Sequence, residues 1–264
     1  MVSLLTRGLH QHARLLGILS AGLFLFEWAL VWVATRIDMG PGFRQILGSL
    51  LPPDVVEIIF GQFGFASFEG AVSFGYQHPM ALTGAMAMVV VMATLPALER
   101  ETGFLDLVLS RPLTRIRYLT AAVLLMGVTA VLPPLALLSG GAVGLYVVDA
   151  PAGVTWSRYL PAGVMLGLLL LAVGSYTLLF ATEARRRGTA VAQTVGVTLL
   201  FYWLDFMGDY WDLLETARAL SPFHYFDPAS VSSQGISLGD AAVLGMVGVA
   251  CCTGAFFNFR RQNL

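Results

Sequence analysis

The sequence predicts an all-α membrane protein with six transmembrane helices, in a single domain over residues 1–264. The chain is 57% hydrophobic and only 12% charged, which is far more apolar than an ordinary globular domain. Six apolar runs have roughly the 20 residues that a helix needs to cross a membrane. None of them contains an arginine, and none contains more than one acid. They cover residues 15–34, 80–98, 119–143, 160–181, 189–206 and 238–259.

The arginines predict how these helices are oriented. Cytoplasmic loops of membrane proteins are enriched in basic residues. Eleven of the fifteen basic residues, all of them arginine, lie on one side of the predicted spans. Arg36, Arg44, Arg158 and Arg218 lie on the other side, where most of the acids also are. We therefore expect both termini to be cytoplasmic, in a multi-pass protein of the cell (inner) membrane.

Two predicted helices have a feature of their own. Before the first span, leucines alternate with arginines and histidines over residues 4–16, which predicts an amphipathic helix at the cytoplasmic interface. The third span contains Pro133-Pro134, where two successive backbone donors are missing. A kink or a broken helix is expected at this point.

Glu27 is the one acid well inside a predicted span. At about 1.5 Å per residue it lies slightly beyond the middle of the membrane. An ionised carboxylate is unfavourable there unless it is paired or hydrated, so one interpretation is a lining of the translocation path or an interhelical lock. The alternative is local pairing near the outer headgroups, helped by Trp28 and Trp32.

Aromatic and acidic side chains alternate after the fifth span, over residues 201–212. An aromatic belt at the membrane interface explains them. The functional alternative is an outer vestibule that binds or releases a substrate through stacking and negative charge. Its residues would be Trp203, Asp205, Asp209, Tyr210 and Trp211. Residues 221–228 then form an outer loop too short and apolar for a solvated domain, which predicts a re-entrant pair of half-helices before the last span.

A compact charged segment, residues 98–118, lies between the second and third spans. Phe104 and Leu105 lie four residues before Val108 and Leu109, so the four apolar side chains would share one side of a helix, and Pro112 would end it. A short amphipathic cytoplasmic helix is therefore expected. The segment is explained either as an arginine-rich loop that fixes the orientation, or as a helix whose apolar side is covered by a partner or by the membrane surface.

The residue types limit the chemistry. The chain has no lysine, so it cannot form a P-loop, whose lysine contacts the nucleotide phosphates. Any ATP would be bound by another subunit. Cys251 and Cys252 are adjacent in the last span and are interpreted as packing residues. No zinc-protease motif and no membrane-embedded serine–histidine pair is found, so we expect no catalytic residue, no metal and no nucleic-acid partner.

The segment between the second and third spans resembles a loop of type-2 ATP-binding-cassette (ABC) exporter permeases. Its pattern is Glu99-Arg-Glu-x-Gly103-Phe-Leu-Asp-Leu-Val-Leu-Ser-Arg-Pro112-Leu-x-Arg115. Ser221-Pro-Phe-His-Tyr-Phe226 is similar to a segment of the same family, and the span count and the leading interfacial helix agree with it. The chain departs from the family at Phe104-Leu105-Asp106, where Thr-Leu-Glu is common, and it lacks the usual lysine after the arginine-rich turn.

The resemblance implies that two permease subunits pair in the bilayer and that each docks on an ATPase subunit through a coupling helix. ATP and Mg²⁺ would be bound by the ATPase, whose closure drives alternating access. The resemblance places the contacts at Glu99, Glu101, Gly103, Leu105, Asp106, Arg111, Pro112 and Arg115.

Two other functions remain open from the sequence. The chain fits a membrane scaffold that passes a signal to an ATPase during cofactor or metal-centre maturation. An intramembrane enzyme is disfavoured by the missing motifs. Neither the substrate nor the choice between a homodimer and a heterodimer follows from the sequence, because exporters of many compounds share one scaffold.

Overall fold

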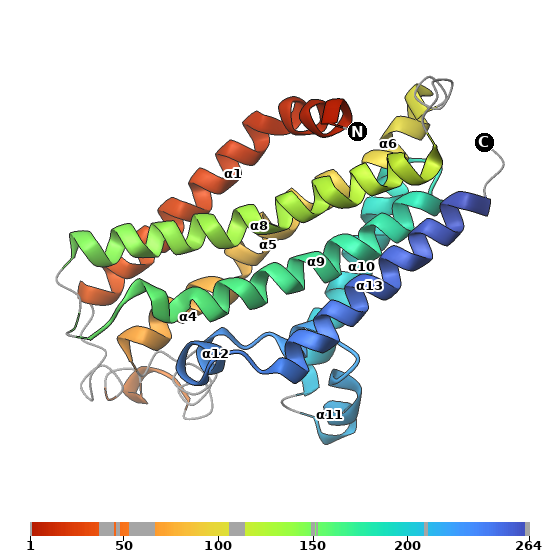
Figure 1. The fold of residues 1–264 in the computed structure, drawn as a ribbon. Coiled ribbons are helices and arrows are strands. Elements are labelled where there is room, and N and C mark those ends of the chain that lie inside the picture. The colour runs from red at the N-terminus through yellow and green to blue at the C-terminus, as the bar shows by residue number, and fades with distance from the viewer. Residues whose placement is uncertain are drawn as a thin grey trace.

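The structure is a computed structural model that describes residues 2–36, 45, 48–52, 67–105, 114–148, 151, 153–208 and 211–261. The described residues form helices and connecting turns, with no strand among them. Five helices are long and apolar enough to cross a membrane, and a bent pair of helices makes a sixth candidate. The expected all-α membrane fold is therefore confirmed (Figure 1).

The six spans follow the order that the sequence predicts. The first and third are single helices of 35 and 33 residues, and the second consists of three successive helices with the break after α5. The spans are α1 (Val2–Arg36), α4–α5–α6 (Phe68–Gln77, Pro79–Ala93, Leu95–Glu101), α8 (Arg115–Val147), α9 (Leu160–Glu183), α10 (Arg187–Gly208) and α13 (Leu238–Arg261). The short helices between them are η2 (Trp156–Tyr159), α11 (Asp212–Arg218), η3 (Pro222–Tyr225) and α12 (Pro228–Gln234).

The second span begins earlier than the apolar run that starts at residue 80. α4 starts at Phe68, where the hydroxyl of Ser67 caps the helix by accepting from the amide of Gly70 at 3.0 Å. His78 and Pro79 then join α4 to α5. The extra turns hold Glu69, so hydropathy alone does not find them.

α9 lies at the centre of the bundle. It packs against α5, α8, α10, α12 and α13, and much of it is enclosed by these neighbours (Figure 1). Its residues Met165, Leu166, Leu169 and Leu170 are fully buried. α10 and α13, by contrast, keep most of their apolar side chains on the outside of the described bundle.

α1 and α8 pack closely because α8 has glycines on the facing side. A Cβ atom at Gly140 would overlap the backbone carbonyl of Phe24, and one at Gly144 would lie 2.9 Å from the Cβ of Val31. Small residues four apart allow membrane helices to approach at backbone distance. The first turns of α1 run at an angle to the rest of the helix (Figure 1).

α8 continues through Pro133-Pro134 as one helix, so the expected break is not found. The missing amide hydrogens leave the carbonyls of Thr129 and Ala130 without their usual helical donors. α9 lies against this point with a glycine: a Cβ atom at Gly167 would be 3.8 Å from Cγ of Pro134 and 4.0 Å from the carbonyl oxygen of Ala130. Packing on α9 thus supports the helix where its own backbone bonds are missing.

The two ends of the bundle differ. Both described chain ends and α6 lie at one end, and α4, α11 and α12 lie at the other (Figure 1). Residues 221–234 fold back at this second end as η3 and α12, and α12 packs on α4 and α9. This arrangement agrees with a pair of short helices that does not cross the membrane.

Candidate functional site

The chain turns sharply at Thr94, at the end where both termini lie. The helix pair before and after this residue is bent by 48°. The hydroxyl of Thr94 is turned back to the carbonyl of Val90, to which it donates at 2.7 Å. Pro96, two residues later, has no amide hydrogen with which to continue the backbone ladder. The sequence Thr94-Leu95-Pro96 therefore ends α5 and starts α6 in a new direction.

Arg187, the first residue of α10, holds this bend from the side. Its Nε donates to the hydroxyl of Thr94 at 3.1 Å, and its Nη2 donates to the carbonyl of Val91 at 3.4 Å. The carbonyls at the carboxyl end of a helix carry partial negative charge, which a guanidinium complements. A cation from α10 is thus bound at the end of α5.

Two charged side chains of α6 contact the turn between α9 and α10. Nη1 of Arg100 donates to the carbonyls of Thr182 and Ala184, both at 3.0 Å, and so caps the end of α9. Oε2 of Glu101 accepts from the backbone amide of Arg187 at 2.9 Å, at the start of α10. Each charge matches the helix end that it meets. We call Thr94, Arg100, Glu101 and Arg187 the α6 latch.

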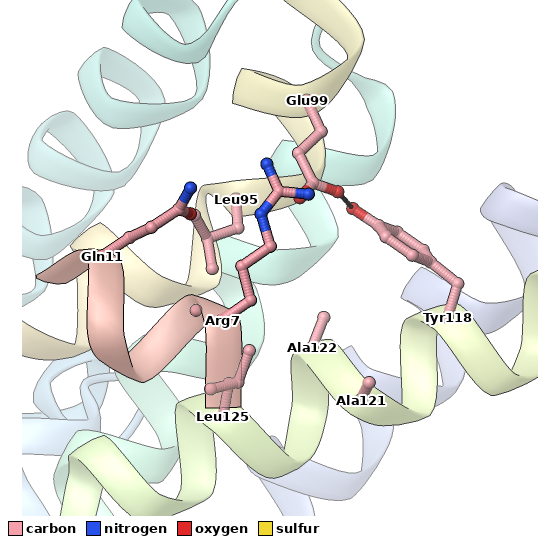
Figure 2. A pocket seen from close by; sticks show the side chains of 9 residues that line it. Arg7, Gln11, Leu95, Glu99, Tyr118, Ala121, Ala122 and Leu125 are labelled. Atoms are coloured by element: carbon pink, nitrogen blue, oxygen red, sulfur yellow. Dashed lines mark hydrogen bonds between the residues drawn. The ribbon is translucent and has the colours of Figure 1, made fainter. Parts of the chain in front are cut away.

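A second polar cluster joins α6 to α1 and α8 (Figure 2). The hydroxyl of Tyr118 in α8 donates to Oε2 of Glu99 at 2.5 Å. The guanidinium of Arg7 in α1 points to the same carboxylate, on which its charge acts, and it lies 3.9 Å from the ring centroid of Phe104. A cavity of about 30 Å³ lies between these side chains, with Gln11 at its wall. It has room for a water molecule.

The expected coupling residues are only partly described. Glu99 and Glu101 are engaged within the chain, as above, and Leu105 is buried. α6 ends at Glu101, and Gly103 follows with a φ of 69°, a left-handed conformation that favours glycine. Arg115 is the first residue of α8. Asp106, Arg111 and Pro112 lie outside the described residues.

Glu27 is completely buried between α1, α4 and α8. Both carboxylate oxygens are enclosed, and neither has a hydrogen-bond partner among the described residues. The expected local pairing near the outer headgroups is not seen there: Trp28 and Trp32 make no hydrogen bond to it that the structure describes.

The expected vestibule residues are only partly described. Oδ1 of Asp205 lies 3.4 Å from Nη2 of Arg218 and 3.7 Å from Nδ1 of His224, so its charge is paired between α10, α11 and η3. Trp203 and Trp211 are both more than half exposed. Asp209 and Tyr210 lie outside the described residues.

Arg100 and Arg187 do not stand out in the sequence, in which they are only two of the positive charges that predict the orientation. Their partners lie more than 80 residues away in the chain, so no local pattern predicts the hydrogen bonds. A weak signal is present in the Thr-Leu-Pro sequence at residues 94–96, which predicts an interruption inside an apolar run.

Long apolar helices and a bent span held by charged side chains define a multi-pass membrane protein. Residues 19–260 match the family described as "Multidrug efflux system permease Rv1217c, C-terminal domain". The chain therefore belongs to this family of efflux permeases, the membrane subunits of ABC exporters, and the resemblance found in the sequence is confirmed. No curated protein matches the chain with significant similarity.

Proposed function

We propose that a separate ATPase subunit drives this efflux permease from the end of the bundle that carries α6. The ATPase would dock on α6 and the residues that follow it, up to Arg115 at the start of α8. The α6 latch is the observation that carries this proposal. Because Arg100 and Glu101 bind the end of α9 and the start of α10, a displacement of α6 is transmitted to both spans.

The residue content supports an external source of energy. The chain has no lysine for a P-loop, so ATP and Mg²⁺ would be held by the ATPase and not by the permease. In the proposed cycle, ATP binding closes the ATPase subunits and moves the α6 segments, and the spans pass from inward-open or closed to outward-open. Hydrolysis resets them. This is alternating access, with the permease in a non-catalytic role.

A second permease subunit would complete the translocation path for the substrate. α10 exposes Val195, Leu199 and Leu200 on the outside of the described bundle, and each is about half exposed. In a bilayer such a face is covered by lipid or by a neighbouring subunit. We propose that this neighbour is a second copy of the chain. We also propose hydrophobic drug-like compounds as the substrates, because the family is one of multidrug efflux permeases.

We propose that the protein lies in the inner membrane of the cell, with α6 and both termini on the cytoplasmic side. The arginine distribution supports this orientation. It puts the α6 latch where a soluble ATPase can reach it. Trp203, Asp205 and Trp211 would then face the opposite side, with Glu27 between the two.

Co-purification with the ATPase tests the proposal. The double variant Glu101→Arg with Asp106→Arg should release the ATPase from the detergent-solubilised complex and leave the permease in the membrane. The control is Glu215→Arg with Asp240→Arg, which makes the same change of charge at the opposite end and should retain the ATPase. Full retention by the first variant, with normal stimulation of ATP hydrolysis, would refute docking at α6.

Transport in proteoliposomes separates an exporter from a scaffold. A fluorescent hydrophobic dye should move across the membrane when ATP is added to the complex, and should stimulate ATP hydrolysis. Stimulation without any movement of several such dyes would favour the signalling scaffold.

A further inference from the structure

Glu27 is the most unusual buried group of the described bundle. Its carboxyl group is fully buried, and both of its oxygens lack a hydrogen-bond partner among the described residues. Most buried polar atoms in proteins have a partner, so each exception needs an explanation. The α6 latch does not use this residue, and it lies away from the end where the ATPase would dock.

The packing around Glu27 is tight. A Cβ atom at Gly75 in α4 would overlap Oε2 of Glu27, and one at Gly141 in α8 would lie 3.5 Å from its Cγ. Glycines on two helices therefore form the walls against which the side chain is pressed. The bundle is shaped to hold this carboxyl group, but it offers no counter-ion in contact with it.

The titratable groups that the structure describes around this site lie on α4, on η2 and at the junction between α4 and α5. Tyr76 in α4 and Tyr159 in η2 interact electrostatically with Glu27, and His78 lies against Phe26 with 5.0 Å between the ring centroids. The facing side of α8 consists of Gly140, Gly141 and Gly144 and contributes no charge. No arginine is among these neighbours, so no cation of the described bundle contacts the carboxyl group to stabilise its ionised form.

A buried carboxylate without a cation or hydrogen-bond donors is strongly unfavourable, whereas a neutral carboxylic acid is tolerated. We propose that Glu27 is a proton-binding site. In the packed arrangement of α1, α4 and α8 the carboxyl group holds a proton. It loses the proton when α1 separates from α4 and the site becomes hydrated.

Tyr159 provides the route for the proton. Its hydroxyl is also buried and without a partner among the described residues, and it interacts electrostatically with both Glu27 and Glu69. Glu69 lies in the first turn of α4 and its side chain is about one-third exposed. Its Oε1 lies 3.6 Å from Nη1 of Arg158. When the site is hydrated, a water molecule between the two groups accepts the proton of Glu27 and passes one of its own to the hydroxyl oxygen of Tyr159, which gives its proton to Glu69. The electron pair of the broken O–H bond stays on Glu27, and the tyrosine remains neutral.

The protonation state of Glu27 can be measured on the permease alone, in lipid, by infrared difference spectroscopy against Glu27→Gln. The amide is neutral and has nearly the same shape as the acid. The wild-type protein should contain the carbonyl band of a neutral carboxylic acid at neutral pH, and this band should be missing from the variant. A difference spectrum that holds only carboxylate bands would overturn the proposal.

The control variant is Glu69→Gln, which should lose carboxylate bands and keep the acid band. If Glu27→Gln does not fold, Glu27→Asp should shift the acid band without removing it. An unshifted band would assign it to another residue and overturn the proposal.

Tyr159→Phe tests the route of the proton: the acid band should remain, and its exchange with deuterium should become several-fold slower. An unchanged exchange rate would remove Tyr159 from the path. None of these results depends on the ATPase, so they stand apart from the proposed docking at α6.

Discussion

The carboxylate of Glu101 accepts a hydrogen bond of 2.9 Å from the backbone amide of Arg187. This contact joins the last residue of α6 to the first residue of α10, across 86 positions of the chain. The side chain of Arg187 also donates a hydrogen bond to the hydroxyl of Thr94, the residue just before α6. α6 is thus held at both ends by a single residue of another span.

Replacing Arg187 by glutamine should loosen the bend at Thr94. The variant loses two hydrogen bonds from a charged donor, and such bonds contribute about 1.5–3 kcal/mol each. We expect a lower melting temperature and a loss of substrate-stimulated ATP hydrolysis, with the ATPase still bound. The matched control is Arg186→Gln, because this neighbouring side chain is exposed. Equal effects of the two variants would contradict a specific role of Arg187.

Glu101→Gln separates the capping role of this residue from a docking role. Glutamine keeps an oxygen that can accept from the amide of Arg187, but loses the charge that favours a helix start. The expected loss of stability is only about 0.3–1 kcal/mol, and the ATPase should remain bound. Release of the ATPase by this mild change would mean that the charge of Glu101 contacts the partner directly.

Tyr118→Phe should weaken the attachment of α6 to α8. It removes the donor to Oε2 of Glu99 and leaves a half-buried carboxylate with one partner fewer, which costs about 1–3 kcal/mol. Thermal unfolding of the purified permease measures the effect. Tyr146→Phe is the control, because Tyr146 is 92% exposed and should tolerate the change. A Tyr118 variant as stable as the control would argue against this hydrogen bond.

Gly140→Ala tests the contact between α1 and α8. The new methyl group would overlap the carbonyl of Phe24, and overpacking of this kind destabilises by about 1–3 kcal/mol. Gly127→Ala is a control in the same helix, since no atom lies within 4 Å of its Cβ position. We expect the control to be neutral or slightly stabilising, because alanine favours a helix more than glycine does. Similar melting curves for both variants would contradict the close approach.

The orientation in the membrane can be measured by labelling. Cysteines placed at Arg186 and at Glu215, in a background with Cys251 and Cys252 replaced by serine, lie at opposite ends of the bundle. A membrane-impermeant maleimide added to intact cells should label the second and not the first. The reverse pattern would place α6 outside the cell and exclude a cytoplasmic ATPase.

The sequence predicts the spans better than it predicts how they are bent and joined. The fourth span was expected at residues 160–181 and α9 covers Leu160–Glu183, because a continuous apolar run ends there at a charge. Pro133-Pro134 predicted a kink or a break, and α8 is not broken there; the glycine of α9 that lies against α8 at this point is remote in sequence. Hydropathy describes each helix alone, whereas a break depends on its neighbours.

The polar sites show the same limit. Glu27 stands out in the sequence as an acid inside a span, but its lack of a partner depends on Gly75 and Gly141 from two other helices. Glu99 and Glu101 were predicted as contacts for a partner protein, and the chain itself binds both. Arg187 was predicted only as a positive charge, although it is the centre of the α6 latch.

The central position of α9 limits which parts of the bundle can move. Sliding α9 would disturb its packing with α5, α8, α10, α12 and α13 at once, together with the fully buried residues Met165 and Leu169. α1 and α10 pack against fewer helices of the described bundle, so fewer helix–helix interfaces would change if either of them tilted. In the proposed cycle α9 would then be the fixed helix of this permease, and the outer helices would move relative to it.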